Sequence, residues 1–222
     1  MEKLKRNRVQ TSQRIINALE EVIAEKGIHG IGINRISEKA GVSKVLIYRY
    51  FGGLDGLLIH YIKMGRLFPL VSPVTLEQLR PVHENDLSKV WFKQLVHTYR
   101  FFRQVPAAFQ ILKATVTEDS AVADEASKAF DEELTRLVEQ LAYVKGADFQ
   151  AVSAIMTGAM SYLTLLAKNN RTVVGINLST EEGWQRIEDA VRIIYTGLNH
   201  MAVQSENVSL EVHQPGVSST YW

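Results

Sequence analysis

The sequence predicts an all-α protein, and three observations support this. Apolar residues recur at spacings of three and four through most of the chain, with charged residues between them, as in amphipathic helices. No segment alternates apolar and polar residues in the way that a half-buried strand does, and no internal repeat occurs. Glycine and proline stand between the periodic segments, where helices are expected to end.

The first part of the chain is expected to form four helices. Thr11 or Ser12 would cap the first helix, and Gly27 would end it. Gly41 would end the second helix, and the pair Gly52-Gly53 would end the third. The expected ranges are 11–26, 33–40, 43–51 and 54–66.

A boundary between a small head and a larger body is expected after these helices. Pro69, Pro73 and Pro81 punctuate a stretch without helical periodicity. Helices are then expected over 84–105, 106–117, 120–141, 148–169 and 180–204, with a connector at 170–179 that is too short to establish a strand. The predicted units are residues 1–66, residues 67–204 and a tail of residues 205–222, for which no structure is predicted.

The composition is that of a globular protein. Of the 222 residues, 46% are hydrophobic and 22% are charged, and the lack of cysteine excludes disulfide and thiolate chemistry. The first residues are basic and polar and do not resemble a signal peptide. The uncharged segment 151–167 falls short of the roughly 20 residues of a membrane span. A buried helix, a cytoplasmic location and no membrane partner are therefore expected.

The charges are distributed unevenly along the chain. Residues 1–66 hold 12 Lys and Arg against 6 Asp and Glu, whereas the remainder holds 13 against 18. A basic head on an acidic body suggests that the head meets a polyanion. The first basic side chains would reach along a DNA backbone or into a minor groove, or would form a mobile arm without specific contact; they are Lys3, Lys5, Arg6 and Arg8.

The segment 33–51 has the pattern of a helix-turn-helix. Ala40 is small, so two helices can approach closely, and Gly41 tolerates the left-handed conformation that such a turn requires. Val42 would fill the space between the helices, and Ser43 would cap the second helix. This geometry presents a second helix to the major groove of DNA.

The second helix of this motif is expected to have an inner and an outer face. Ile47 and Phe51 lie four residues apart and would point inward. The opposite face then carries basic and tyrosine side chains, which suit phosphate contacts, and a valine, which suits a thymine methyl group. An ordinary helical hairpin with a solvated basic face is the alternative. The candidate DNA-binding residues are Arg35, Ser43, Lys44, Val45, Leu46, Tyr48, Arg49 and Tyr50.

Over residues 11–62 the sequence resembles the TetR family of transcriptional regulators. The resemblance is carried by Arg14-Ile15-Ile16, by Ala40-Gly41-Val42-Ser43 and by Tyr48-Arg49-Tyr50-Phe51. It implies a three-helix helix-turn-helix DNA-binding domain with a connecting fourth helix, followed by a larger helical domain for ligand binding and dimerisation.

The resemblance also implies roles for individual residues. Ser43 and the two tyrosines, Tyr48 and Tyr50, would mainly hold phosphates, whereas Lys44 and Val45 are better placed for base edges. The sequence differs from the family pattern at three positions: Val45 replaces a glycine, Gly32 replaces a capping threonine, and Leu54 replaces a lysine that contacts phosphate. DNA binding would then be weaker or differently oriented.

The body offers candidates for a ligand cavity and for a dimer interface. An aromatic cluster with nearby polar residues would line a cavity, although a single aromatic residue more often belongs to the core than to a pocket. The ligand candidates are Trp91, His97, Tyr99, Arg100, Phe102, Phe109, Met156 and Tyr162. The last two helices carry small residues and an apolar stripe that would form a four-helix bundle with a two-fold mate, or would pack within one chain. The dimer candidates are Ala151, Ile155, Ala159, Trp184, Ile187, Val191, Ile194, Tyr195 and Leu198.

These patterns predict a homodimeric regulator that binds an inverted-repeat operator in double-stranded DNA. A small-molecule effector would release it, so that it acts as a repressor; activation is an alternative, because the direction of regulation depends on where the operator lies. One alternative is a DNA-bound adaptor without a ligand. Another is an enzyme with an accessory helix-turn-helix, which is disfavoured because the chain has no nucleophile elbow, phosphate loop or metal-binding histidine pair. No catalytic residue, metal or cofactor is expected.

Overall fold

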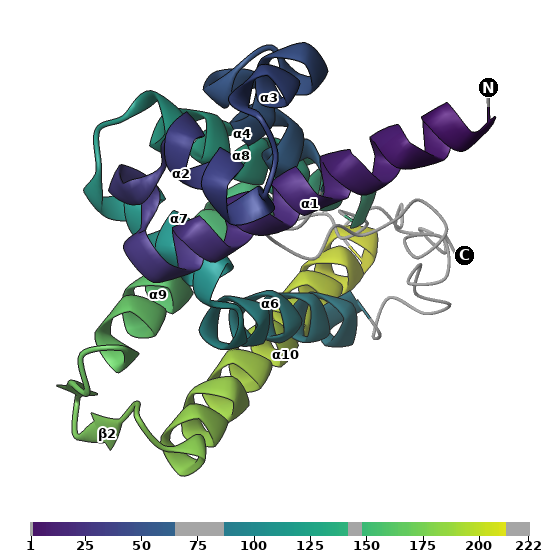
Figure 1. Cartoon of the computed structure of the whole chain (residues 1–222). Coiled ribbons are helices and arrows are strands. Elements are labelled where there is room, and N and C mark those ends of the chain that lie inside the picture. The colour runs from purple at the N-terminus through teal and green to yellow at the C-terminus, as the bar shows by residue number, and fades with distance from the viewer. Residues whose placement is uncertain (1, 65–86, 142–147, 212–222) are drawn as a thin grey trace, which may run out of the picture.

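The computed structural model describes residues 2–64, 87–141 and 148–211, and most of them are helical (Figure 1). The prediction of an all-α fold is confirmed. The elements are α1 (Glu2–Lys26), the 3-10 turn η1 (Ile28–Gly30), α2 (Ile33–Ala40), α3 (Lys44–Phe51), α4 (Leu54–Lys63), α6 (Leu87–Gln104), α7 (Pro106–Thr117), α8 (Ala121–Leu141), α9 (Phe149–Ala167), the strands β1 (Thr172–Val173) and β2 (Ile176–Asn177), and α10 (Glu181–Glu211).

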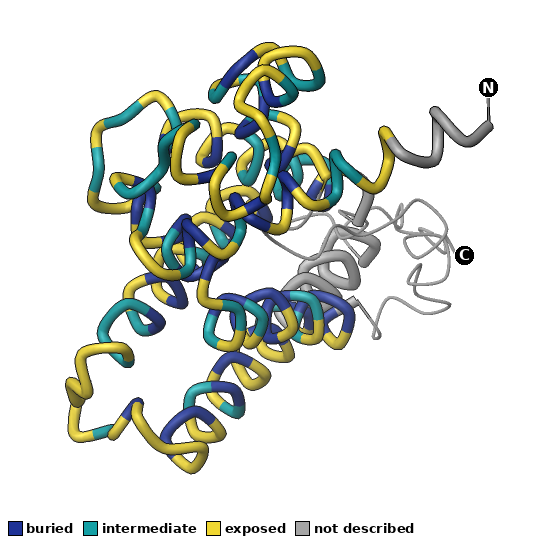
Figure 2. Tube along the Cα trace, in the orientation of Figure 1, coloured by how far each residue is buried: buried dark blue, intermediate teal, exposed yellow. Residues whose placement is uncertain are grey.

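The head consists of α1 to α4 around a small apolar core. One face of α1 supplies Ile15, Leu19 and Ile23, which are fully buried, and α2 and α3 close over it with Ile36 and Ile47. Figure 2 shows the same division, with buried positions on the inner faces and exposed positions on the outside of these helices. Burying each such side chain stabilises the fold by about 1.5–3 kcal/mol, so the core holds α3 at a fixed angle.

The body is built around α6, which crosses α10 and also contacts α7 and α9 (Figure 1). Its apolar face carries Trp91, Tyr99 and Phe102, all nearly fully buried. The indole Nε1 of Trp184 donates a hydrogen bond of 2.8 Å to the carbonyl of Leu178. This bond ties the start of α10 to the segment that precedes it.

Two helix pairs join the head to the body. α7 packs against α1, and α8 packs against α4. Nε2 of His29, in η1, lies 3.2 Å from Oε2 of Glu118 at the end of α7. A movement of α7 or α8 therefore acts directly on the helices that hold α3.

Both terminal helices are longer than expected. α1 begins at Glu2 rather than at Thr11, and α10 continues to Glu211 rather than ending near residue 204. Residues 2–10 are rich in Lys, Arg, Glu and other good helix formers and contain no glycine or proline, so the helix extends without needing a buried face. The expected boundary near residue 66 and the tail residues 212–222 lie outside the described residues.

The connector at 170–179 forms a small hairpin that the sequence did not predict. Thr172 pairs with Asn177, and Val173 pairs with Ile176. The two residues between the strands, Val174 and Gly175, both have positive φ angles of 50° and 74°. Two such residues form the kind of turn that matches the twist of paired strands.

Among the described helices, α9 is long and apolar enough to cross a membrane, judged by length and composition alone. In the fold it packs against α6 and α8. Met156, Met160 and Thr164 are buried, but Ile155 and Tyr162 on another face are exposed. The expectation of a buried helix thus holds for one side of α9 only.

Candidate nucleic-acid interface and buried pockets

The corner between α2 and α3 has the geometry expected of a helix-turn-helix. Gly41 adopts the left-handed conformation, with φ 60° and ψ 42°, and the Val42 N–H donates to the Ser37 carbonyl at 3.0 Å. The Ser43 hydroxyl accepts a hydrogen bond of 3.3 Å from the Val45 N–H and so caps α3. A Cβ at position 41 would also lie 2.9 Å from Nη2 of Arg14. The predicted left-handed conformation of Gly41 and the predicted cap at Ser43 are confirmed.

Arg14 fastens this corner to α1. Its Nη2 donates to the Ala40 carbonyl at 2.6 Å and to the Gly41 carbonyl at 3.1 Å. Both carbonyls belong to the end of α2, where helices leave acceptors without an internal partner. Sequence reasoning noticed Arg14 only as part of a motif, because its partners lie 26 and 27 residues away.

We expect Arg14→Ala to destabilise the protein by about 1–2 kcal/mol, because two hydrogen bonds from a charged donor are lost. Urea denaturation followed by circular dichroism measures this loss. Arg192→Ala is the matched control, since Arg192 makes an exposed ion pair with Asp189 and should change stability by less than about 0.5 kcal/mol. Equal effects of the two substitutions would show that Arg14 does not stabilise the corner.

The outer face of α3 is exposed to solvent. Val45 is 63% exposed and Tyr48 57% exposed, and Lys44 and Arg49 are exposed as well. Ile47 is fully buried on the opposite face. The helix lies at one end of the molecule, away from the body (Figure 1). This is the arrangement of inner and outer faces expected from the sequence.

The other candidates of the head lie at the margin of this face. Arg35 is exposed on α2, and its Nη1 donates to the Gly30 carbonyl, so it links α2 to η1. Leu46 and Tyr50 are half-buried. The guanidinium of Arg8 lies over the Tyr50 ring, 5.2 Å from its centroid. The side chains of Lys3, Lys5 and Arg6 lie outside the described residues.

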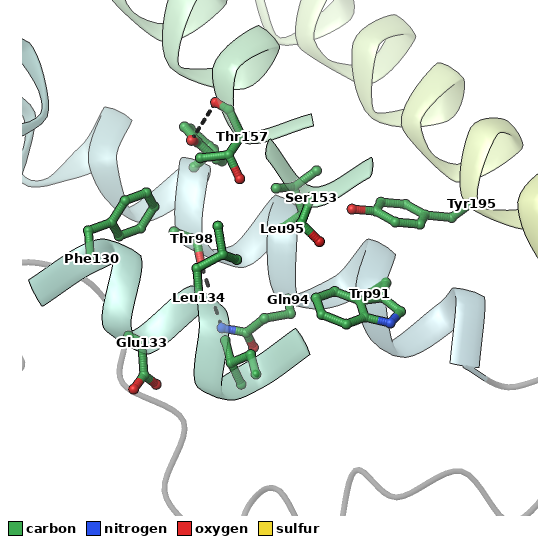
Figure 3. A pocket seen from close by; sticks show the side chains of 12 residues that line it. Trp91, Gln94, Leu95, Thr98, Phe130, Glu133, Leu134, Ser153, Thr157 and Tyr195 are labelled. Carbon is green, nitrogen blue, oxygen red and sulfur yellow. Dashed lines mark hydrogen bonds between the residues drawn. The ribbon is translucent and has the colours of Figure 1, made fainter. Parts of the chain in front are cut away.

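A narrow apolar pocket lies between α6, α8, α9 and α10. The centre of a water molecule can occupy about 40 Å³ of it, whereas one water needs roughly 10–15 Å³. Figure 3 shows side chains from all four helices around this space. Its lining includes Trp91, Leu95, Phe130, Leu134, Leu137 and Tyr195.

Of the eight ligand candidates, only Trp91 and Tyr99 line this pocket. The other six lie elsewhere, because helical period does not reveal what covers each face. His97 and Tyr162 are exposed, and Phe102 and Met156 are buried without lining the pocket. Arg100 and Phe109 line a second pocket near the ends of α6 and α9. Sequence reasoning missed residues from α8 such as Phe130 and Leu134, which carry only an ordinary amphipathic signal.

The hydroxyl groups at the pocket are uncharged. The Tyr99 hydroxyl donates to the Thr157 carbonyl at 2.8 Å and lies 2.7 Å from the Ser161 hydroxyl. Burial raises the pKa of Tyr99 well above its ordinary value of 10.0, and it raises the pKa of Tyr195 to about 12. Both phenols therefore stay protonated at neutral pH, as an apolar pocket requires.

These two tyrosines should make the protein less stable in alkali. In the unfolded chain they ionise near pH 10, whereas Tyr195 in the folded protein ionises only near pH 12. Between these values only the unfolded state gains the charge, so the free energy of unfolding falls by about 1.4 kcal/mol per pH unit for each group. Urea denaturation between pH 9 and 11 measures the fall. Tyr195→Phe should make it shallower, and an unchanged slope would contradict the assignment.

The dimer candidates divide between the core and the surface. Trp184, Val191 and Tyr195 are buried within the chain, because α10 packs its inner face against α6. Ile187 and Leu198 are half-buried. The other four candidates are exposed. Two further large apolar residues on these helices are also exposed: Tyr162, which was a ligand candidate, and Ile193, which the sequence analysis did not single out. We call these six residues the outer apolar face: Ala151, Ile155, Ala159, Tyr162, Ile193 and Ile194.

Residues 15–61 match the sequence model of "Bacterial regulatory proteins, tetR family". This range covers the core of the head, the corner and α3. The head of the chain therefore belongs to the TetR family of bacterial regulatory proteins. Within the TetR head, Leu54 stands where the family pattern has lysine, and it is half-buried against the core. Among the described residues, no group of His, Asp and Glu side chains could hold a metal ion.

The curated relatives share mainly the head with this chain. The HTH-type transcriptional regulator BetI of Vibrio vulnificus is 44% identical over 45 residues, which are 20% of this chain and 23% of that protein. An uncharacterized HTH-type transcriptional regulator of Mycobacterium tuberculosis is 28% identical over 97 residues, 36% of this chain and 48% of that protein. The chain thus covers less than half the length of these relatives.

Solved structures share the fold over both the head and the body. The fatty acid degradation regulator FadR from Bacillus halodurans superposes with a TM-score of 0.59 at 18% identity, over 84% of this chain and 95% of that chain. A TetR transcriptional regulator from Rhodococcus sp. RHA1 gives a TM-score of 0.51 at 17% identity, over 89% and 96%. At such identities the likeness concerns the fold alone.

Proposed function

We propose that this protein is a dimeric, sequence-specific DNA-binding transcriptional regulator and that α3 enters the major groove. The observation that carries the proposal is the outer face of α3, where lysine, arginine, tyrosine and valine side chains are exposed beside a helix-turn-helix corner. Residues 1–66 are the DNA-binding unit, and the helices of 67–204 are the regulatory unit. The proposal assigns no catalytic role to the chain.

Within the groove, the residues of the head divide by chemistry. Lys44 and Val45 stand at the start of α3 and would meet base edges, because N-terminal residues of a recognition helix lie deepest in the groove. Tyr48, Arg49 and Ser43 would contact phosphates. The flanking candidates Arg35, Leu46 and Tyr50 would support these contacts, and Arg8 would extend them along the backbone.

Two heads are needed to read an operator. We propose that the outer apolar face of α9 and α10 meets its two-fold mate in a four-helix bundle. Six exposed apolar side chains on the last two helices support this assignment. A two-fold dimer reads an inverted repeat whose half-sites are separated by about one helical turn of DNA or a multiple of it.

The apolar pocket of the body would take an uncharged, largely apolar effector. The pocket touches α8, which packs on α4, and α6, which leads into α7 and so to α1. An effector that widens the pocket would move these helices and change the separation of the two recognition helices. It would release the operator only to the extent that it binds the DNA-free conformation more tightly. The protein would then act as a repressor.

Selection from random oligonucleotides with the purified full chain tests the proposal. We expect enrichment of one inverted repeat, and an affinity that falls about 10³- to 10⁵-fold between 50 and 200 mM salt if six to ten phosphates are contacted. Recovery of no common sequence, or of a motif without two-fold symmetry, would contradict the proposal. Adding small apolar compounds to the selected complex then tests release.

A further inference from the structure

A second pocket, polar and separate from the apolar one, lies where the ends of α6 and α9 meet the start of α10. Its volume is about 560 Å³, within the range of roughly 300–1,000 Å³ typical of small-molecule sites. Three cationic side chains line it: Arg100, Arg103 and Lys168. Figure 1 shows the β-hairpin connecting α9 to α10 at the end of the molecule opposite α3.

Two of these cations share a single buried carboxylate. Glu188 has a side chain that is only 6% exposed, and Arg100 donates to it through Nε at 2.9 Å and through Nη2 at 2.5 Å. Arg103 reaches the same carboxylate only through Nη2, at 3.4 Å. Because Arg100 already holds both carboxylate oxygens, the guanidinium of Arg103 is incompletely neutralised.

Arg103 is also incompletely hydrogen-bonded. Its side chain is 17% exposed, and its guanidinium lies over the Trp184 ring, 3.8 Å from the centroid. Its Nε is buried and has no hydrogen-bond partner among the described residues. Burial lowers the pKa of Arg103 despite the nearby Glu188, as expected for a desolvated cation. A buried donor without a partner is costly, and a ligand acceptor would remove this cost.

A second buried polar group lines the same pocket. Thr164 is 1% exposed, and its hydroxyl has no partner among the described residues. Lys168 lies across the pocket with its Nζ over the Phe109 ring, 5.6 Å from the centroid. No carboxylate of the described residues lies within 4 Å of that amine.

We propose that this pocket binds a small organic carboxylate with a compact apolar group. The carboxylate would pair with Arg103 and Lys168 and accept from Thr164, because a planar carboxylate matches the donor geometry of a guanidinium. The apolar group would contact the rings of Trp184 and Phe109. The three cations face two carboxylates, Glu181 and Glu188, so one added negative charge neutralises the pocket. The site does not depend on the proposed DNA-binding function.

Isothermal titration of the full chain without DNA tests this site, with benzoate and cyclohexanecarboxylate as probes. Benzamide and cyclohexanecarboxamide are the uncharged controls of the same shape. We expect saturable binding of at least one acid, about tenfold tighter than its amide, because only the acid forms charge-assisted hydrogen bonds. If neither acid saturates at 20 mM, or if acid and amide bind equally, the proposal is wrong.

Three variants locate the binding. Lys168→Gln removes a charge from an exposed position and should weaken the acid about tenfold, whereas Lys93→Gln, an exposed lysine of α6 outside the pocket, should leave binding unchanged. Thr164→Val removes a buried unpaired hydroxyl, so it should keep or raise the melting temperature while weakening the acid. If Lys168→Gln and Lys93→Gln changed the affinity for the acid equally, or if Thr164→Val bound the acid as tightly as the parent, the assignment would be overturned.

Discussion

Replacing Lys44 and Tyr48 together by alanine is expected to weaken specific operator binding at least about a thousandfold. Both side chains are exposed on the outer face of α3. Each groove or phosphate contact of this kind contributes about 1–3 kcal/mol, and a two-fold dimer loses each contact twice. Fluorescence anisotropy with the selected operator measures the loss.

The double variant should fold and assemble as the parent does, because both side chains are exposed and outside the core of the head. Circular dichroism, melting temperature and dimer mass provide this control. Lys93 is an exposed lysine of the body, so Lys93→Ala tests whether losing any positive charge is enough to weaken operator binding. It should change operator affinity by no more than about twofold. A double variant with undiminished operator affinity would show that α3 is not the recognition helix.

Replacing Ile155 by glutamate is expected to convert the dimer into monomers at micromolar concentration. Ile155 is 70% exposed in the single chain and lies in the outer apolar face of α9 and α10. Burying an unpaired carboxylate in an apolar interface costs several kcal/mol, and two-fold symmetry repeats that cost. The dissociation constant of the dimer should therefore rise more than about a thousandfold, and operator affinity should fall with it. Analytical ultracentrifugation measures the first effect.

Val116→Glu is the matched control for this substitution. Val116 is 57% exposed on α7, outside the outer apolar face, so a charge there should leave the dimer and the operator affinity intact. A melting temperature close to that of the parent would show that Ile155→Glu acts on assembly rather than on folding. If Ile155→Glu stays dimeric, the two chains associate through another surface.

The corner of the head was predictable from the sequence because its interactions are local. Gly41 and Ser43 act through their own backbone angles and through partners within a few residues. The inner and outer faces of α3 follow in the same way from the spacing of Ile47 and its neighbours. Arg14 was different, since its two carbonyl partners are brought to it only when α1 packs beneath α2.

The body shows where helical period stops being informative. On α10, Trp184, Val191 and Tyr195 looked like one interface stripe together with Ile194, but the first three are covered by the chain itself. The period of a helix reveals that a face is apolar, but not whether α6 or a second chain covers it. The pocket residues were missed for the same reason, because they come from four helices that only the packing brings together.

The amino-acid sequence alone therefore determined the helical class, the helix-turn-helix corner and the outward residues of α3, because these depend on short-range backbone and period effects. The tertiary structure decided which helices join the head to the body, which faces of α9 and α10 are buried or exposed, and that two arginines share Glu188. Those features arise between residues far apart in the chain, whose proximity depends on how all the helices pack at once.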